Sequence, residues 1–163
     1  MRELILLRHA HAEPARAEPA QAGQADLDRP LSAAGHAEAE AAGRWLKDMR
    51  LMPDRALCSP ARRARETLEG VLAVIGDVEQ RLDEGIYEAS AGTLAALVDQ
   101  HREVGRLLVV GHNPGLERLA ALMHSGQSGD YRGMPPGGIA VLRLPAETAI
   151  EPGIATLSEF WWP

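Results

Sequence analysis

The run Leu4-Ile5-Leu6-Leu7 constrains the fold of this chain more than any other feature. Four consecutive aliphatic residues are typical of a strand buried on both faces, as in a parallel sheet that helices cover on each side. The run stops at Arg8 and His9. Because parallel sheets bind their ligands just beyond the carboxyl ends of their strands, these two side chains are candidates for a functional site.

A second buried strand is predicted over residues 106–110, and it too stops at a histidine, in the segment Gly111-His112-Asn113-Pro114. We expect Asn113 to cap the following helix and Pro114 to open it. A short strand over residues 55–58 is followed at once by Ser59-Pro60, where proline predicts the start of another helix, through about residue 74. Strands that end in polar side chains therefore recur along the chain.

The remaining patterns complete an α/β fold. Strands are also predicted over residues 78–82, 138–144 and 154–162, and helices between Ser32 and Pro53 and over residues 93–101. Strands that alternate with helices predict a three-layer sandwich, in which a mostly parallel central sheet has helices on both faces. With 163 residues, we expect a single domain over 1–163. Residues 11–30 lack apolar periodicity and contain several prolines, which predicts a long irregular connection.

Charge, apolar runs and cysteine content indicate the partners and the compartment to expect. The net charge of −6 argues against a nucleic-acid partner, and no apolar run approaches the length needed to cross a membrane. The N-terminus lacks a basic region followed by an apolar stretch and a cleavage site. The single cysteine, Cys58, suits a reducing compartment. We therefore expect a cytoplasmic protein without a membrane partner.

The side chains at the strand ends suit phosphate chemistry. The guanidinium of Arg8 can hold two phosphate oxygens while His9 attacks phosphorus or donates a proton to the group. Arg63 falls in the first turn of the helix after Ser59, where backbone amides and the helix dipole also favour an anion. Its neighbours Arg62 and Arg65 point in other directions, so we expect only one of the three to face the site.

Two other catalytic chemistries are alternatives to phosphoryl transfer through His9. A cysteine-dependent phosphatase needs an arginine at a fixed offset from Cys58, but the residue at that offset is Ala64. A metal hydrolase is a second alternative, because His9 and His11 alternate as ligands do on an extended segment. Nearby arginines would repel a divalent cation, so we predict no metal and no other cofactor. A third alternative is a non-catalytic phosphate-binding module, against which the two strand-end histidines argue.

Together, three segments resemble the histidine phosphatase superfamily, which has the phosphoglycerate-mutase-like fold. They are Arg8-His9-Ala10, the pattern Ser59…Arg63-Ala64…Thr67, and Gly111-His112. The short chain and the segment Arg29-Pro30-Leu31-Ser32…Gly35 resemble its small branch, the phosphohistidine phosphatases. The family usually has glycine where this chain has Ala10, a change that the small branch tolerates.

The resemblance implies a role for each matching residue. His9 would be the nucleophile, forming a covalent phosphohistidine that water then hydrolyses. Arg8 and Arg63 would hold the phosphoryl oxygens, and His112 would donate to the same group. Arg29 would be a further phosphate contact.

The general acid of the family is a carboxylate in the loop after the third strand. Glu84 and Glu88 are both candidates, and Glu84 is included in our predicted catalytic set. The small branch often lacks a clear acid, because a protonatable nitrogen leaves phosphorus more readily than an alkoxide.

The substrate class follows from the short intervals between motifs, which leave little room for a lid over the pocket. The connection over residues 11–30 has no apolar stripe that could pack as a cap. An uncovered pocket offers a small molecule few contacts beyond its phosphoryl group. We therefore predict a phosphorylated protein of the histidine-phosphotransfer type as substrate, with a small phosphate ester as the alternative.

Overall fold

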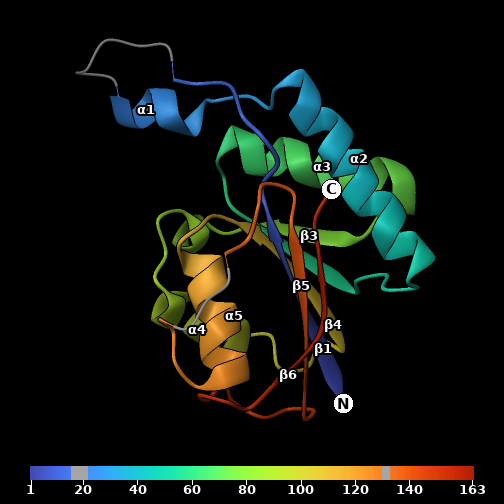
Figure 1. Cartoon of the computed structure of the whole chain (residues 1–163), viewed down its shortest axis with the longest axis vertical. Coiled ribbons are helices and arrows are strands. Elements are labelled where there is room, and N and C mark those ends of the chain that lie inside the picture. Colours follow the sequence, from blue (N-terminus) through green and yellow to red (C-terminus); the bar gives the residue numbers. More distant parts are fainter. Residues whose placement is uncertain (16–21, 130–132) are drawn as a thin grey trace.

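The computed structural model describes residues 1–15, 22–129 and 133–163. Six strands in the described residues form one sheet, in the order β3-β2-β4-β1-β5-β6 (Figure 1). Their bounds are β1 (Arg2–Arg8), β2 (Arg55–Cys58), β3 (Glu79–Leu82), β4 (Arg106–Gly111), β5 (Ile139–Leu144) and β6 (Thr156–Trp161). Neighbours among β3, β2, β4 and β1 are parallel, whereas β5 and β6 are added antiparallel. The predicted, mostly parallel sheet is confirmed.

Helices cover both faces of this sheet, which confirms the three layers. Helices α2 and α3 pack together on one face, and α4 and α5 pack together on the other (Figure 1). The helical segments are α1 (Ala22–Leu27), α2 (Ala33–Asp48), α3 (Arg62–Ile75), the short 3₁₀ helix η2 (Glu84–Ile86), α4 (Ala91–Asp99) and α5 (Gly115–Ser125). None of the described helices is both long and apolar enough to cross a bilayer.

Strand β1 shows why an unbroken apolar run was needed. Ile5 and Leu7 belong to the core cluster beneath α2 and α3, whereas Leu4 and Leu6 belong to the cluster beneath α4 and α5. All four side chains are at most 2% exposed. Successive strand residues point to opposite faces, so a strand at the centre of a three-layer fold must be apolar at every position.

Three local expectations are corrected. Residues 22–27 form α1, so the segment after His11 is not irregular throughout; residues 16–21 lie outside the described part. Helix α3 begins at Arg62 rather than at Pro60. Asn113 does not cap α5, because its amide donates to the Glu117 carboxylate and to the Met134 carbonyl oxygen.

Cys58 is a buried strand residue, as predicted. Its side chain is inaccessible at the end of β2. Burial raises the pKa of its thiol to about 12, so the sulfur stays protonated at neutral pH and is a poor nucleophile.

Candidate active site

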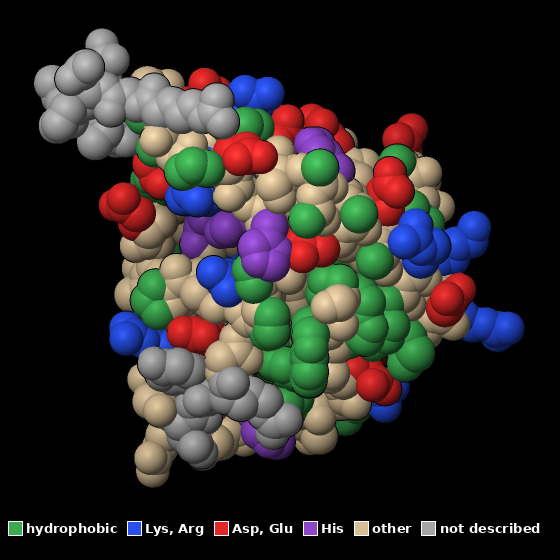
Figure 2. Space-filling view, turned by 45° about the horizontal axis from the view of Figure 1, so that its top comes forward, with side chains coloured by type: hydrophobic (Ala, Val, Ile, Leu, Met, Phe, Trp, Pro, Cys, Tyr) green, Lys and Arg blue, Asp and Glu red, His purple; other side chains and the backbone are tan. Residues whose placement is uncertain are grey.

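Three adjacent parallel strands end together and place polar side chains at one edge of the sheet. Arg8 of β1 lies opposite Gly111 of β4, and the amide of His9 donates to the Gly111 carbonyl oxygen at 3.0 Å. The next residue along β4, His112, brings its ring centroid to 5.2 Å from that of His9. Ser59 follows β2 on the other side of β4. Histidine and arginine side chains gather on this face in Figure 2.

His9 is held as a neutral imidazole. Its Nδ1 lies 2.8 Å from the carbonyl oxygen of Ala10, which can only accept, so Nδ1 carries the proton and Nε2 keeps its lone pair. Burial, helped by the positive charges of Arg63 and Arg8, lowers the pKa of His9 to about 4 against the raising effect of the Ala10 bond. At neutral pH, Nε2 is therefore available as a nucleophile.

His112 is also neutral and keeps one nitrogen without a partner. Its Nε2 lies 2.7 Å from the hydroxyl of Ser59, and its Nδ1 is buried with no hydrogen bond to any described residue. Burial lowers its pKa to about 3, with further contributions from His9 and Arg63. When Ser59 donates to Nε2, the ring proton is on Nδ1 and is available to a bound ligand. Sequence reasoning noted Ser59 in a motif but gave it no role.

Arg8 is anchored on one side only. Its Nη1 donates to the Met134 carbonyl oxygen at 2.8 Å, and the same oxygen accepts from the Asn113 amide. The Nε of Arg8 is buried and has no hydrogen-bond partner among residues 1–15, 22–129 and 133–163. This N–H is therefore free to bind an anion.

Arg63 is fixed to the segment after β1 through Thr67. The Thr67 hydroxyl donates to the Arg63 carbonyl oxygen at 2.7 Å and accepts from the amide of Ala10 at 3.0 Å. Arg63 itself is only 6% exposed, and its Nε is also buried without a partner. The spacing from Ser59 to Thr67 thus serves the packing of α3 against the strand end.

Two residues that sequence reasoning missed complete this cluster. Asp26 of α1 accepts from Arg63 Nη2 at 3.2 Å through its carboxylate, while its backbone carbonyl accepts from Nη1 at 2.7 Å. The Tyr87 hydroxyl donates to the same carboxylate, and the Tyr87 ring meets the His112 ring edge-on. No apolar periodicity or capping motif in the sequence points to Asp26. The only sequence signal for Tyr87 is its position next to the candidate acid Glu88.

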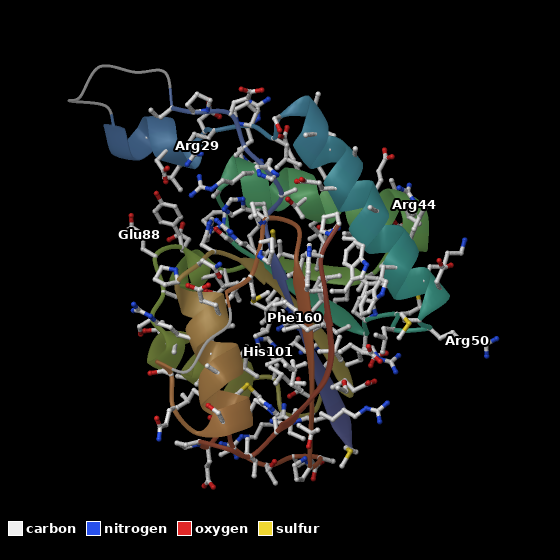
Figure 3. All side chains as sticks on the ribbon, viewed as in Figure 1. Arg29, Arg44, Arg50, Glu88, His101 and Phe160 are labelled. Atoms are coloured by element: carbon white, nitrogen blue, oxygen red, sulfur yellow. The ribbon has the colours of Figure 1, made fainter. Side chains whose placement is uncertain are left out.

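Arg29 joins the cluster through Asp26. Its Nη1 donates to Asp26 at 3.3 Å and its Nε to the Glu13 carbonyl oxygen at 2.8 Å. Its positive charge also lowers the pKa of His9, after burial and the nearer arginines. Figure 3 shows Arg29 and Glu88 on the same side of the molecule.

Comparison with known proteins decides the family. The model of the histidine phosphatase superfamily (branch 1) matches residues 4–108. The chain belongs to the histidine phosphatase superfamily. That membership supports a phosphatase activity.

Relatives and solved structures agree with this family. The chain is 39% identical over 152 residues to an uncharacterised protein of Mycobacterium tuberculosis, covering 86% of this chain and 93% of the relative. It is similar to a protein of Agrobacterium tumefaciens named as a phosphohistidine phosphatase, SixA, with a TM-score of 0.81, 32% identity, and coverage of 99% and 98% of the two chains. A protein of Nakamurella multipartitia with the same name gives a TM-score of 0.81 at 26% identity, covering 99% and 96%.

Neither predicted carboxylate of this histidine phosphatase is hydrogen-bonded to the two histidines in the described structure. Glu84 is exposed in η2, and Glu88 is exposed just after it. In the described residues, no hydrogen bond joins either one to His9 or His112. The general acid remains a prediction, and the carboxylate that the fold places among the site arginines is Asp26.

Glu84 lies instead in the wall of a pocket between α1 and the loop after β2. The pocket has a volume of about 490 Å³. Its lining residues are Gln24, Leu27, Asp28, Pro60, Arg65, Glu84 and Tyr87. Tyr87 is shared with the histidine cluster, so this pocket adjoins the candidate active site.

The alternating histidines do not form a common ligand set. His11 Nδ1 pairs with the Glu38 carboxylate of α2 at 2.6 Å, whereas His9 Nδ1 donates to the backbone. Within residues 1–15, 22–129 and 133–163, no three His, Cys, Asp or Glu side chains are placed to hold a metal ion. Helix α2 approaches this segment closely because Gly35 has no Cβ, which would lie 2.0 Å from the His11 carbonyl oxygen.

Proposed function

We propose that the protein hydrolyses protein-borne phosphohistidine through a covalent phosphohistidine intermediate on His9. One observation carries the mechanism. The neutral imidazole of His9 lies near Arg8, Arg63 and His112, and three of their buried nitrogens have no acceptor among the described residues: the Nε atoms of the two arginines and Nδ1 of His112. Buried polar groups are rarely left unpaired, so unpaired donors around a nucleophile favour a bound phosphoryl group.

The reaction then proceeds in two displacements. The lone pair of His9 Nε2 forms a bond to phosphorus, and the bond between phosphorus and the leaving nitrogen breaks with its electron pair on that nitrogen. The substrate imidazole carries a proton on its other ring nitrogen, so it leaves as a neutral imidazole. Water next attacks the phosphorus and releases phosphate, which restores Nε2. Arg8, Arg63 and His112 stabilise the negative charge spread over the equatorial oxygens in both steps.

No hydrogen bond joins Glu84 or Glu88 to His9 or His112 in the described residues, and this fits a nitrogen leaving group. An alkoxide leaving group needs a proton from a nearby acid, but the imidazole of a phosphohistidine is a far better leaving group at neutral pH. Asp26 does not replace the glutamates as acid. Burial alone would raise its pKa, but hydrogen bonds from Tyr87, Arg63 and Arg29 outweigh this and lower it, so it is ionised at neutral pH.

An exposed aromatic side chain beside the site supports a protein substrate. Trp161, the last residue of β6, pairs with Ile139 of β5, which pairs in turn with Leu7 of β1. The next residue, Trp162, therefore lies at the same edge of the sheet as Arg8, and it is 55% exposed. With a strand spacing of about 4.8 Å, it lies roughly 10 Å from β1, within the footprint of a docked protein.

The pocket beside Tyr87 favours the second candidate, a small-molecule phosphomonoesterase. A small ester whose phosphoryl group sits at His9 would find further contacts there. The two candidate functions are distinguished by measuring kcat/KM side by side for a phosphorylated histidine-phosphotransfer domain and for a panel of small phosphate esters. Preference for one ester over the phosphoprotein would select the second candidate and leave the His9 mechanism intact.

The mechanism is tested by trapping the intermediate. Brief incubation with a labelled phosphodonor should leave an acid-labile, base-stable phosphate on the wild-type protein. His9→Ala should lose both the label and the activity. His11→Ala is the matched control, because His11 is a nearby histidine paired with Glu38, and it should keep both. A label mapped to another residue, or a fully active His9→Ala variant, would overturn the assignment.

A further inference from the structure

Asp26 contacts Arg63 in a way that leaves the arginine partly unpaired. The carboxylate and the backbone carbonyl of Asp26 take the two terminal nitrogens, Nη2 and Nη1. The third nitrogen, Nε, is buried and has no acceptor within the part of the chain that the structure describes. Asp26 therefore fixes the plane and rotation of the guanidinium while the buried Nε–H group remains for a ligand.

Arg63 needs such a partner because of its burial. Its side chain is 7% exposed, and the Asp26 carboxylate is the only side chain with which it forms an ion pair in the described residues. A buried guanidinium without a counter-charge is strongly disfavoured. Arg8 is held differently, by the Met134 carbonyl oxygen, so the two arginines have separate anchors.

Asp26 is in turn held from two other directions. The Tyr87 hydroxyl donates to its Oδ2, and Arg29 donates to its Oδ1. These contacts join α1 to the loop after η2 and to the segment before α2. Tyr87 also touches His112, so the same network extends to the second site histidine.

We propose that Asp26 is a positioning residue for phosphoryl transfer: its carboxylate, clamped by Tyr87, sets the orientation in which Arg63 binds the phosphoryl group. The inference rests on the proposed function, because it assigns Arg63 to phosphoryl binding. Helix α1 is then part of the catalytic architecture rather than a spacer. If Asp26 were instead an internal anion that the substrate must displace from Arg63, removal of its charge would strengthen oxyanion binding.

Oxyanion binding distinguishes these two roles without relying on turnover. The dissociation constant of tungstate is measured by calorimetry for wild type and for Asp26→Asn, which has nearly the same shape but no charge. Positioning predicts weaker binding by about tenfold or more, together with a raised KM, as for the loss of a group that orients a catalytic residue. Tighter or unchanged tungstate binding by Asp26→Asn would overturn the proposal.

Three companion variants make the test specific. Asp28→Asn removes a carboxylate two residues away, which is exposed and lies 3.8 Å from Arg62, and it should bind tungstate as wild type does. Tyr87→Phe keeps the ring but removes the donor to Asp26, so it should weaken binding. Its effect should be less than additive in the double variant with Asp26→Asn, because both changes act through one network. Additive effects would contradict the clamp.

A general loss of structure is excluded by a rescue variant. Asp26→Glu keeps the charge on a longer side chain and should recover part of the tungstate affinity that Asp26→Asn loses. Equal losses in both variants, at unchanged thermal unfolding, would contradict a role for the charge. Failure of the proposed function gives a different result: wild type forms no phosphohistidine, whatever the Asp26 variants do.

Discussion

Burial distinguishes Arg63 from the basic residues beside it. Arg62 pairs with Glu66, and the exposed Arg65 donates to the Pro60 carbonyl oxygen. Arg63 instead turns inward, because Thr67 fixes its helical turn against Ala10. The packing of α3 therefore determines the inward direction of Arg63, and it places the charge of this side chain at the strand ends.

The two site histidines predict a pH dependence of stability. Folding lowers the pKa of His9 from 6.5 to about 4 and that of His112 to about 3. Below pH 6.5 the unfolded chain binds protons that the folded protein does not, so the free energy of unfolding falls as the pH drops toward 4. The fall is at most about 1.4 kcal/mol per pH unit for each histidine, and above about pH 7.5 these groups contribute no slope.

Urea unfolding of wild type and His112→Asn checks this dependence. Between about pH 7.5 and about pH 5.5, wild type should lose more stability than the variant, which lacks one of the depressed groups. An equal loss in both proteins would show that His112 does not titrate as its buried position requires.

At this scale, much of the candidate site could be predicted from sequence. Arg8, His9 and His112 end buried strands, and strand ends are recognisable from apolar runs that stop at polar residues. Asp26 could not be found, because its contacts come from Arg63 and Tyr87, which are distant along the chain. A carboxylate whose role depends on contacts with distant residues produces no local sequence pattern.

Helix α3 and the segment after β1 form one structural unit through Thr67. The hydroxyl is fully buried and has both a donor and an acceptor as partners. Thr67→Val keeps the shape but leaves the Ala10 amide without an acceptor. We expect it to lower the free energy of unfolding by about 1–3 kcal/mol, the cost of one buried unsatisfied group.

Thr67→Ser serves as the control for this prediction. It keeps the hydroxyl and removes only a methyl group, so its loss in urea unfolding should be clearly smaller than that of Thr67→Val. Equal losses would mean that packing, rather than the hydrogen bonds, joins the two elements.

The element boundaries that differ from the sequence expectation have local causes. Helix α3 starts after Pro60 because the Ser59 hydroxyl accepts from the Ala61 amide and forms a turn first. Helix α1 has no apolar period of its own, and Asp26 within it is held by side chains of Arg29, Arg63 and Tyr87. Short elements that depend on tertiary contacts are the ones that periodicity does not reveal.

The sheet places the exposed Trp162 beside the candidate active site, and this predicts different effects of its removal on a protein substrate and on a small one. Trp162→Ser should lower kcat/KM for a phosphorylated histidine-phosphotransfer domain by about tenfold, equivalent to about 1.4 kcal/mol of lost contact. It should leave kcat/KM for a small phosphate ester unchanged, because the ester does not reach this strand.

Met52→Ser is the matched control for a protein contact. Met52 is also an exposed apolar residue, but it precedes β2 and so lies at the opposite end of the sheet. It should affect neither substrate. If Trp162→Ser reduced turnover of both substrates alike, the aromatic edge would be a structural element rather than a docking surface.

The order of strands also has a consequence for biosynthesis. Strand β1, which carries Arg8, leaves the ribosome before the other strands, but its two neighbours are β4 and β5, whose residues emerge roughly a hundred positions later. Such distant pairing delays folding until most of the chain has been made. A nascent or truncated chain that lacks β5 has only one of the two neighbours of β1, so we expect the candidate site at the carboxyl end of β1 to form only after β5 has been made.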